Sequence, residues 1–350
     1  MRKPIIGVTM GEPAGIGPEI AVKTLCNSEI NIICKPVILG DKSTLEEAYG
    51  FSQGVENKES YRIVGYDRLE DIVFDENEIA VLDFKNVDIG RIKFGQDSEM
   101  GGKASGEYIK RSIELALEGN IDAIVTGPIS KVSFQMGGWG KKYIGHTEMF
   151  ADLTGTKKYG MLLAHNSFRA MHVTTHIPFK DVPDKITRER ILDTLDLAHQ
   201  SCVLFGIKNP KIIVCGLNPH SGELGKIGTE DINIIAPAIE EYKQKTGTMV
   251  TGPSPADTVW SKVISGAYDI GVAMYHDQGH IPAKLLGFHY EKDGTYKSIS
   301  GMNITIGIPI IRVSVDHGVA YGKAGKGIAT PSSMMESITT AVKLVHNREQ

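Results

Sequence analysis

The sequence lacks any long hydrophobic run. Its N-terminus, MRKPIIGVTMGEPAG, holds an apolar stretch of only a few residues before Gly11 and Glu12, which is too short for a signal peptide or a membrane span. Runs of Lys and Arg are also missing, and the formal net charge is −4 with a pI of about 6.3, so the chain offers no positive field that follows a nucleic-acid backbone. We therefore expect neither a membrane nor a nucleic acid as a partner.

Cysteine is scarce, since the chain of 350 residues has only 4. Cys26, Cys34, Cys202 and Cys215 lie far apart without a CxxC spacing, so neither a zinc knuckle nor a disulfide framework is indicated. This usage fits a reducing compartment, and we expect a cytoplasmic protein.

The sequence also lacks internal repeats, low-complexity tracts and a Pro/Ser-rich linker. Its length favours two domains at roughly 150 residues each, and a sheet shared by both would explain why no linker marks their boundary. The segment MGEPAGIGPEI has no GxGxxG fingerprint, although Gly15, Gly17 and Pro18 mark a tight turn from a strand into a helix. A Rossmann dinucleotide site is not supported there.

Short apolar runs alternate with amphipathic stretches along the chain. The runs with the length and branching of buried strands are IIGV (5–8), PVIL (36–39), IAVL (79–82), AIVT (123–126), MLLA (161–164), IIVC (212–215) and IGVAM (270–274). Between them, Ile109, Ile113, Ala116 and Leu117 fall on one face of a helix. This alternation predicts an α/β fold with a largely parallel twisted sheet and helices on both faces.

Several predicted strands run into polar segments that carry a reactive side chain. Lys131 follows AIVT, His176 follows MHVTT, His220 follows IIVC, and His276 with Asp277 follows IGVAMY. Because ligands of open α/β sheets bind beyond the carboxyl ends of the strands, we expect these segments to converge. A single His at a strand end is more often a hydrogen-bonded loop residue. Three imidazoles with an open coordination position, however, suit Zn²⁺ or another divalent ion.

A phosphate site is the second expectation. GHTEMF (145–150) places His146 and Thr147 where a helix begins, and the free N–H groups of a helix N-terminus bind anions. Lys284 and Arg312 supply charge-assisted contacts, Arg in bidentate fashion. An ordinary helix cap and solvated surface charges are the alternatives.

A family resemblance rests on ordered motifs that run from the first predicted strand almost to the C-terminus. The motifs are MGEPAGIGPEI (10–20), VTGPISK (125–131), GHTEMF (145–150), TTHIP (174–178), GLNPHSGE (216–223), PADT (255–258), MYHDQGHIPAK (274–284), NITIGIPIIR (303–312) and VDHG (315–318). Together they closely resemble the 4-hydroxythreonine-4-phosphate dehydrogenase family of vitamin B6 biosynthesis.

The resemblance implies a homodimer of two-domain subunits, with a site in the interdomain cleft and a metal held by residues from both subunits. By motif, His176, His220 and His276 match the family's ligands for a divalent ion such as Zn, Mg, Mn or Co. The family's substrate-binding positions match His146, Thr147, Lys284, Asn303 and Arg312.

In fold, the family resembles the isocitrate and isopropylmalate dehydrogenases. We therefore expect one α/β domain from residues 1–134 with 315–350, and a second, with the metal and dimer contacts, from residues 135–314. The segment DHGVAYGKAGKGIATP (316–331) looks like the adenosine-binding loop of that fold.

This likeness makes the expected cofactor-binding residues Gly318, Ala324, Gly325 and Gly327. NAD is the expected cofactor. The chain departs from its relatives at Tyr321, Gly322 and Lys323, where they often carry an acidic or aliphatic residue. NADP is the alternative, because Lys323 offers a cation to a 2′-phosphate.

The implied reaction is an oxidation followed by loss of CO2. A divalent ion that chelates the substrate hydroxyl lowers its pKa, so that a base takes the proton while hydride leaves for the nicotinamide. The β-keto acid formed then decarboxylates. Asp257 and Asp277 are candidates for the base or for orienting the ligand imidazoles, with structural hydrogen bonding as the alternative, and Lys131 is a candidate proton donor.

The segment MYHDQGHIPAK carries His280 where the pyridoxine enzymes have an apolar residue. With the following KLLGF, it resembles a branch of the family that acts on D-threonate or D-erythronate 4-phosphate, which bear a 2-hydroxyl in place of a 2-amino group. An imidazole exchanges hydrogen bonds with a hydroxyl, and its protonated form repels an ammonium. We therefore expect a D-tetronate 4-phosphate as substrate and dihydroxyacetone phosphate as product. Oxidation of 4-hydroxythreonine-4-phosphate for pyridoxal phosphate biosynthesis is the alternative.

Two other function classes fit a site of three His residues and a phosphate pocket. A metal-dependent sugar-phosphate aldolase or phosphohydrolase has no use for the nucleotide-like segment, and a non-catalytic sugar-phosphate sensor would normally have lost a ligand position. Residues 289–301 lengthen the connection between Lys284 and Asn303. We expect this polar stretch to be a surface loop that helps cover the phosphate, with a passive insertion as the alternative.

Overall fold

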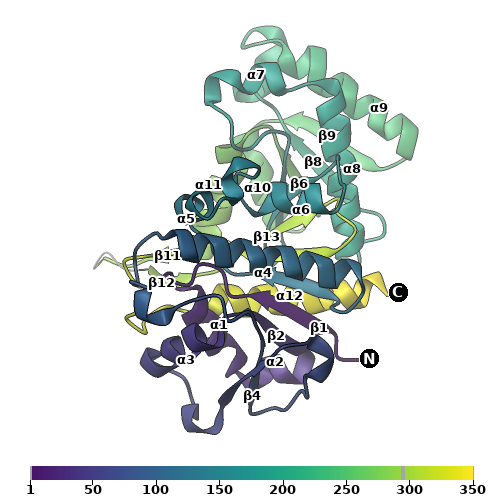
Figure 1. Cartoon of the computed structure of the whole chain (residues 1–350). Coiled ribbons are helices and arrows are strands. Elements are labelled where there is room, and N and C mark those ends of the chain that lie inside the picture. The colour runs from purple at the N-terminus through teal and green to yellow at the C-terminus, as the bar shows by residue number, and fades with distance from the viewer. Residues whose placement is uncertain (1, 293–295, 350) are drawn as a thin grey trace. The chain divides into compact units, whose positions relative to one another are not determined.

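A computed structural model describes residues 2–292 and 296–349 of the chain. The chain forms two compact units, one of residues 1–157 with 308–350 and the other of residues 158–307. Figure 1 labels their elements along the chain. The boundaries expected from the sequence, at 134/135 and 314/315, stay a prediction.

The first unit is built on parallel strands in the order β3-β4-β2-β1-β5-β14. The strands are β1 (Ile5–Thr9), β2 (Lys35–Gly40), β3 (Arg62–Tyr66), β4 (Glu78–Asp83), β5 (Ala123–Thr126) and β14 (Ile311–Val315). The helices are α1 (Gly17–Leu25), α2 (Ser28–Ile33), α3 (Lys42–Phe51), α4 (Glu99–Leu117), α5 (Lys131–Met136), α6 (His146–Leu153) and α12 (Ser332–Arg348). Short 3-10 turns are η1 (Lys58–Ser60), η2 (Leu69–Asp71), η3 (Ile89–Arg91) and η4 (Trp139–Lys141).

Local sequence explains where these elements begin. The side chains of Asn27, Asp41, Ser98 and Ser130 each accept a backbone N–H in the first turn of α2, α3, α4 and α5, the usual work of N-cap residues. The central strands are buried apart from Lys35 at the start of β2, as strands covered on both faces must be, and most of their residues are apolar.

The strand order reverses direction between β1 and β5. From β1 the chain moves outward on one side to β2, β3 and β4. After β4 it returns past β2 and β1 and adds β5 on the other side of β1. Because parallel crossovers are right-handed, this reversal puts α4 on the opposite face from α1. Helices α1, α2, α3 and α12 accordingly pack in one group, while α4 packs with α5 and α6. Ligands of such sheets bind at the reversal, beyond the carboxyl ends of the two strands.

The second unit has strands in the order β13-β6-β7-β10-β8-β9. Strands β7, β10, β8 and β9 are parallel, and β6 runs antiparallel to β7 and β13. The strands are β6 (Gly160–His165), β7 (Phe168–His172), β8 (Lys211–Cys215), β9 (Met249–Ser254), β10 (Ile270–Ala273) and β13 (Met302–Ile306). The helical elements are η5 (Phe179–Asp181), α7 (Val182–Lys185), α8 (Arg188–Leu204), η6 (Pro219–Gly225), η7 (Asp231–Ile235), α9 (Ala236–Thr246), α10 (Ala256–Ile264) and α11 (His276–Gly287).

Helices α8, α10 and α11 pack on the strands of this unit, and the core between them includes Phe168 against Trp260. The expected α/β class with a largely parallel sheet is thereby confirmed in both units. Every run expected to be a strand lies in one, except that Met274 of the last run follows the end of β10. Among the described residues, no helix has the length and apolar character to cross a membrane.

The stretch 289–301 was expected to be a surface loop. Its described part instead belongs to an antiparallel pair, β11 (Phe288–Tyr290) with β12 (Tyr296–Ile299). Residues 293–295 lie outside the described part of the chain, and the covering role of this stretch stays a prediction.

Candidate functional site

Three neighbouring strands of the second unit carry the predicted metal ligands at one edge. Strand β10 pairs in parallel with β7 on one side and β8 on the other, so their carboxyl ends lie together. His176 follows β7, His276 begins α11 after β10, and His220 follows β8 within η6. The expected placement of all three at strand ends is what the structure shows.

The rings at this edge form a row that starts in the core. The ring centroids of His172 and His280 are 4.8 Å apart, those of His280 and His276 are 3.6 Å apart and stacked, and those of His276 and His176 are 5.6 Å apart. Gly279 lets this row form, because a Cβ there would meet His172 Nε2 at 2.3 Å. The sequence analysis singled out every member of the row except His172.

Hydrogen bonds fix the orientation of two of these rings. His276 Nδ1 lies 2.7 Å from Asp277 Oδ1, and His280 Nδ1 lies 2.9 Å from the carbonyl oxygen of His276. Burial lowers the pKa of His280 to about 4 and that of His172 to about 3. Both imidazoles are therefore neutral at physiological pH, with Nδ1–H of His280 donating to the carbonyl and its Nε2 left as an acceptor.

His220 stands apart from the other two predicted ligands. It is exposed and begins a left-handed stretch in which His220, Ser221, Gly222, Glu223 and Leu224 all have positive φ. A left-handed conformation costs roughly 1–2 kcal/mol for each residue other than Gly, and strain of this kind concentrates at functional sites. Within the described parts of the chain, no group of three or more His, Cys, Asp or Glu side chains is close enough to hold a metal ion.

A buried carboxylate supports this strained turn. Asp231 is fully buried, and its oxygens accept the backbone N–H of Leu217 at 2.9 Å, the backbone N–H of Asn218 at 3.1 Å and the side-chain amide of Asn218 at 3.0 Å. The sequence analysis missed Asp231. Its distance of only eight positions from the end of GLNPHSGE was the available signal, but nothing in the sequence showed that the chain folds back to bring Asp231 to Leu217 and Asn218.

The remaining predicted residues of the second unit are dispersed. Lys284 lies one turn beyond His280 on α11, and its ammonium sits 4.3 Å from the ring centroid of Phe288. Asn303 lies in β13 opposite Leu163 of β6. Asp257 is exposed in the first turn of α10. The roles of Asp257 and Asn303 in the site stay predictions.

The predicted phosphate residues of the first unit do meet. His146 and Thr147 are the first residues of α6, and Arg312 is buried in β14 with Nη2 donating to Thr126 Oγ1 at 2.8 Å. Burial, followed by the nearby positive charge of Arg312, holds the pKa of His146 well below its ordinary value. Burial likewise lowers the pKa of Arg312 to about 10, which leaves it charged.

These groups suit an anion. His146 Nε2 is buried without a hydrogen-bond partner among the described residues, and it lies near a buried guanidinium at the start of an eight-residue helix. Neutral imidazole, cationic guanidinium and free helix N–H groups all favour a phosphate oxygen. Lys131, by contrast, is exposed at the start of α5, and its proposed proton transfer stays a prediction.

The 316–331 segment connects β14 to α12 through turns. Two of its predicted cofactor residues need glycine, because Gly325 has φ +75° and Gly327 has φ +72° with Phe51 O only 2.1 Å from a would-be Cβ. Gly318 is exposed, and Ala324 is buried. The segment contacts the turn between β1 and α1, which lies at the strand reversal of this unit, because the backbone N–H of Ile16 donates to the carbonyl oxygen of Val319 at 3.1 Å.

A polar cluster at the same edge was missed from the sequence. Asp97 Oδ1 accepts hydroxyl bonds from Ser130, from Ser133 at 3.0 Å and from Tyr321 at 2.7 Å. Desolvation works to raise the pKa of Asp97, but these hydrogen bonds outweigh it and the pKa ends below its ordinary value. The hydrogen bond from its hydroxyl to Asp97 therefore holds the side chain of Tyr321 against this cluster.

Glu12 lies beside this cluster and is fully buried. Burial raises its pKa to about 7, against the lowering effect of hydrogen bonds from Ala14 and Ser133. Its position in GEPAG, directly after the first strand, was a sequence signal for a functional carboxyl, but the sequence analysis considered this segment only for a GxGxxG pattern.

The family model described as pyridoxal phosphate biosynthetic protein PdxA matches residues 32–341. A D-threonate 4-phosphate dehydrogenase of Cupriavidus necator is 40% identical over 346 residues, which cover 99% of this chain and 98% of that protein.

Solved structures agree with the family match. The 4-hydroxythreonine-4-phosphate dehydrogenase from Burkholderia phymatum is 38% identical with a TM-score of 0.81, over 98% of this chain and 99% of that one. The 4-hydroxythreonine-4-phosphate dehydrogenase from Klebsiella pneumoniae is 37% identical with a TM-score of 0.84, over 98% of both chains. The chain belongs to the PdxA family and is an oxidoreductase of the dehydrogenase type.

Proposed function

We propose that the chain oxidises D-threonate or D-erythronate 4-phosphate with a nicotinamide cofactor and a divalent cation, and releases CO2 and dihydroxyacetone phosphate. The observation that carries the proposal is the full-length similarity to the Cupriavidus necator D-threonate 4-phosphate dehydrogenase. Oxidation of 4-hydroxythreonine-4-phosphate is the second candidate, favoured by the similarity to solved structures of 4-hydroxythreonine-4-phosphate dehydrogenases.

The histidine row fits a divalent cation in part. Two imidazoles on one tetrahedral cation have ring centroids on the order of 5 Å apart, and those of His176 and His276 are 5.6 Å apart. Asp277 engages Nδ1 of His276, which leaves Nε2 for a metal in the manner of carboxylate-supported histidine ligands. This contact favours an orienting role for Asp277 and leaves Asp257 as the candidate base.

We place the third ligand on the second subunit of a homodimer. His220 is exposed on a strained turn, and the described residues of one chain hold no complete ligand set. The partner subunit's His220 would complete the pair His176 and His276. When bound, the cation supplies a Lewis acid that lowers the pKa of the substrate hydroxyl and stabilises negative charge during decarboxylation.

The chain's own residues would hold the two ends of the substrate. Arg312, His146 and the N–H groups of Thr147 and its neighbours bind the phosphate, with Lys284 and Asn303 as further contacts. Asp257, the candidate base, would take the hydroxyl proton, and a bound nicotinamide would supply the acceptor for the hydride on the same carbon. The carboxylate carbon then departs as CO2, and Lys131 returns a proton to the carbon it leaves.

The 316–331 segment is the proposed cofactor site. Its turns lie at the strand reversal of the first unit, where sheets of this class bind nucleotides, and Gly325 and Gly327 allow a backbone approach that side chains would block. NAD is the proposed cofactor, through Gly318, Ala324, Gly325 and Gly327. Lys323 makes NADP the alternative, and the ratio of kcat/KM for the two cofactors decides between them.

The structure revises one reason for the substrate choice. Repulsion of an ammonium by protonated His280 does not operate, because burial keeps this imidazole neutral. A neutral acceptor bonds to either a hydroxyl or an ammonium. Discrimination would instead come from Lys284, whose positive charge acts on His280, and from the proposed cation, since both disfavour a substrate ammonium.

Metal content tests the ligand assignment. His176→Ala, His220→Ala and His276→Ala should each lower bound metal and abolish turnover, whereas His199→Ala, in α8 away from the row, should change neither. Chelation should remove the activity of the native protein. Full activity after chelation would overturn the metal-dependent mechanism, and reaction without any nicotinamide would point to an aldolase or phosphohydrolase.

A further inference from the structure

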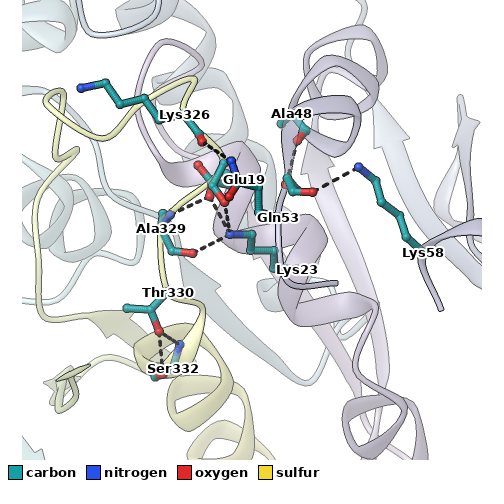
Figure 2. Close-up of polar contacts among 11 residues, drawn as sticks. Glu19, Lys23, Ala48, Gln53, Lys58, Lys326, Ala329, Thr330 and Ser332 are labelled. Atoms are coloured by element: carbon teal, nitrogen blue, oxygen red, sulfur yellow. Dashed lines mark hydrogen bonds and ion pairs between the residues drawn. The ribbon is translucent and has the colours of Figure 1, made fainter. Parts of the chain in front are cut away.

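A buried lysine lies beneath the 316–331 segment. Lys23 is on α1, its side chain is 7% exposed, and its ammonium donates to Gly327 O and Ala329 O, both at 2.8 Å. Figure 2 shows this ammonium between the helix and the segment. Two of its three hydrogen bonds thus go to the backbone of a segment more than 300 residues away in the sequence.

Glu19 completes the arrangement one helical turn earlier. Its side chain is 1% exposed, and Oε1 accepts Lys23 Nζ at 2.7 Å and the backbone N–H of Ala329 at 2.7 Å. The pair therefore binds Ala329 through both its N–H and its carbonyl. Gln53 adds contacts to the same turn, from its backbone to Gly327 O at 3.1 Å and from its side chain to Lys326 O at 3.2 Å.

Surface ion pairs are a useful contrast. Lys42 and Glu46 on α3 also form an i,i+4 pair, at 3.2 Å, but their side chains are 38% and 52% exposed. Burying two charges is costly unless their hydrogen bonds are satisfied. Lys23 Nζ and Glu19 Oε1 meet this condition largely through backbone groups of the 316–331 segment, whereas Glu19 Oε2 is buried without a hydrogen-bond partner among the described residues. The pair and the shape of the segment therefore depend on each other.

We propose that Glu19 and Lys23 are a positioning pair that presets the 316–331 segment for the adenosine part of the nicotinamide cofactor. This inference rests on the proposed cofactor site. The pair touches neither the reacting atoms nor the phosphate-binding residues His146 and Arg312 as far as the described contacts show. Its loss would raise the cost of ordering the segment on binding, which weakens cofactor affinity and leaves the chemical step alone.

Hydrogen exchange of the unliganded native protein is the first test. The amide of Ala329 lies in neither a helix nor a strand, yet it should be strongly protected because it donates to buried Glu19. The adjacent Ile328, 54% exposed, provides the comparison. Equal, fast exchange at both amides would overturn the anchoring, whether or not any cofactor binds.

Variants then test the effect on the cofactor. Lys23→Met and the double variant Glu19→Gln/Lys23→Met should raise the Kd of the reduced cofactor, measured by fluorescence titration, roughly tenfold or more. They should raise KM for the cofactor, while kcat at saturating cofactor and KM for the substrate stay within about twofold. The double variant leaves no lone buried charge, so it is the one expected to fold well.

Lys42→Met is the matched control, since it removes the same charge from the exposed pair on α3. A double variant that folds, exchanges faster at residues 324–331 and still binds cofactor with native Kd would refute the positioning role. If the native protein binds no nicotinamide nucleotide at all, the cofactor part of the proposed function fails, and the exchange result at Ala329 still decides the anchoring.

Discussion

At the scale of single residues, Glu12 couples folding to pH. An unfolded carboxyl ionises near 4.5, whereas burial raises the pKa of Glu12 to about 7 in the folded chain. Between these values the folded state binds more protons, so the free energy of unfolding falls as pH rises through this window. The full effect is on the order of 3 kcal/mol.

Glu12→Gln keeps the neutral shape and removes this titration. We expect the variant to gain stability over the native protein as pH goes from 5 to 8, measured by urea unfolding at both values. Glu99→Gln, at an exposed carboxyl of the first turn of α4, is the control and should show no such gain. If the difference in unfolding free energy between Glu12→Gln and the native protein were the same at pH 5 and pH 8, the carboxyl of Glu12 would ionise normally in the folded chain.

Asp231 is the second residue whose role can be measured directly. Asp231→Asn replaces one acceptor oxygen with a donor that faces the N–H groups of Leu217 and Asn218. We expect a loss of roughly 1–3 kcal/mol in unfolding free energy and metal affinity lower by about tenfold, through His220. Asp269→Asn also removes an acceptor for a backbone N–H, that of Lys211. It should cost stability without weakening metal binding, and equal metal loss in both variants would contradict the account.

At the scale of elements, the glycines of the 316–331 segment differ in what they tolerate. Gly327→Ala places a Cβ against Phe51 O at a φ of +72°, whereas Gly322 has no described atom within 4 Å of a would-be Cβ. We expect Gly327→Ala to weaken cofactor binding strongly and to lower the melting temperature, and Gly322→Ala to change both little. Calorimetry with and without cofactor measures the two effects. Similar behaviour of the two variants would argue against a rigid segment.

The elements also show how far the sequence could be interpreted. The strand runs and the placement of His176, His220 and His276 after strands followed from short-range pattern, because a buried parallel strand and its exit loop are local features. Two sets of contacts did not follow from such patterns. Lys23 bonds to backbone groups about 300 residues away in the sequence, and Asp231 bonds to Leu217 and Asn218 only because the chain between them folds back. The place of His172 did not follow either, because its burial beside Gly279 depends on packing between β7 and α11.

At the scale of the whole molecule, the shared metal site predicts complementation between inactive chains. In a mixed dimer of His276→Ala and His220→Ala subunits, one of the two sites keeps all its ligands. Random mixing should therefore restore about a quarter of native activity and metal content. Mixing His276→Ala with His176→Ala should restore none, because both ligands are assigned to one chain. Absence of recovery in the first mixture, with dimers shown by sedimentation, would place all ligands on one subunit.

The central claim concerns substrate and reaction, and one set of rates tests it most directly. The measurement is kcat/KM for D-threonate 4-phosphate, D-erythronate 4-phosphate and 4-phosphohydroxy-L-threonine, with NAD and NADP and a divalent metal, following reduced cofactor and dihydroxyacetone phosphate. We predict a ten- to hundredfold preference of about 1–3 kcal/mol for a D-tetronate 4-phosphate, and an unchanged preference in His280→Leu, because a neutral imidazole bonds to either substrate. A clear preference for the amino acid would contradict the account and assign the chain to pyridoxal phosphate biosynthesis.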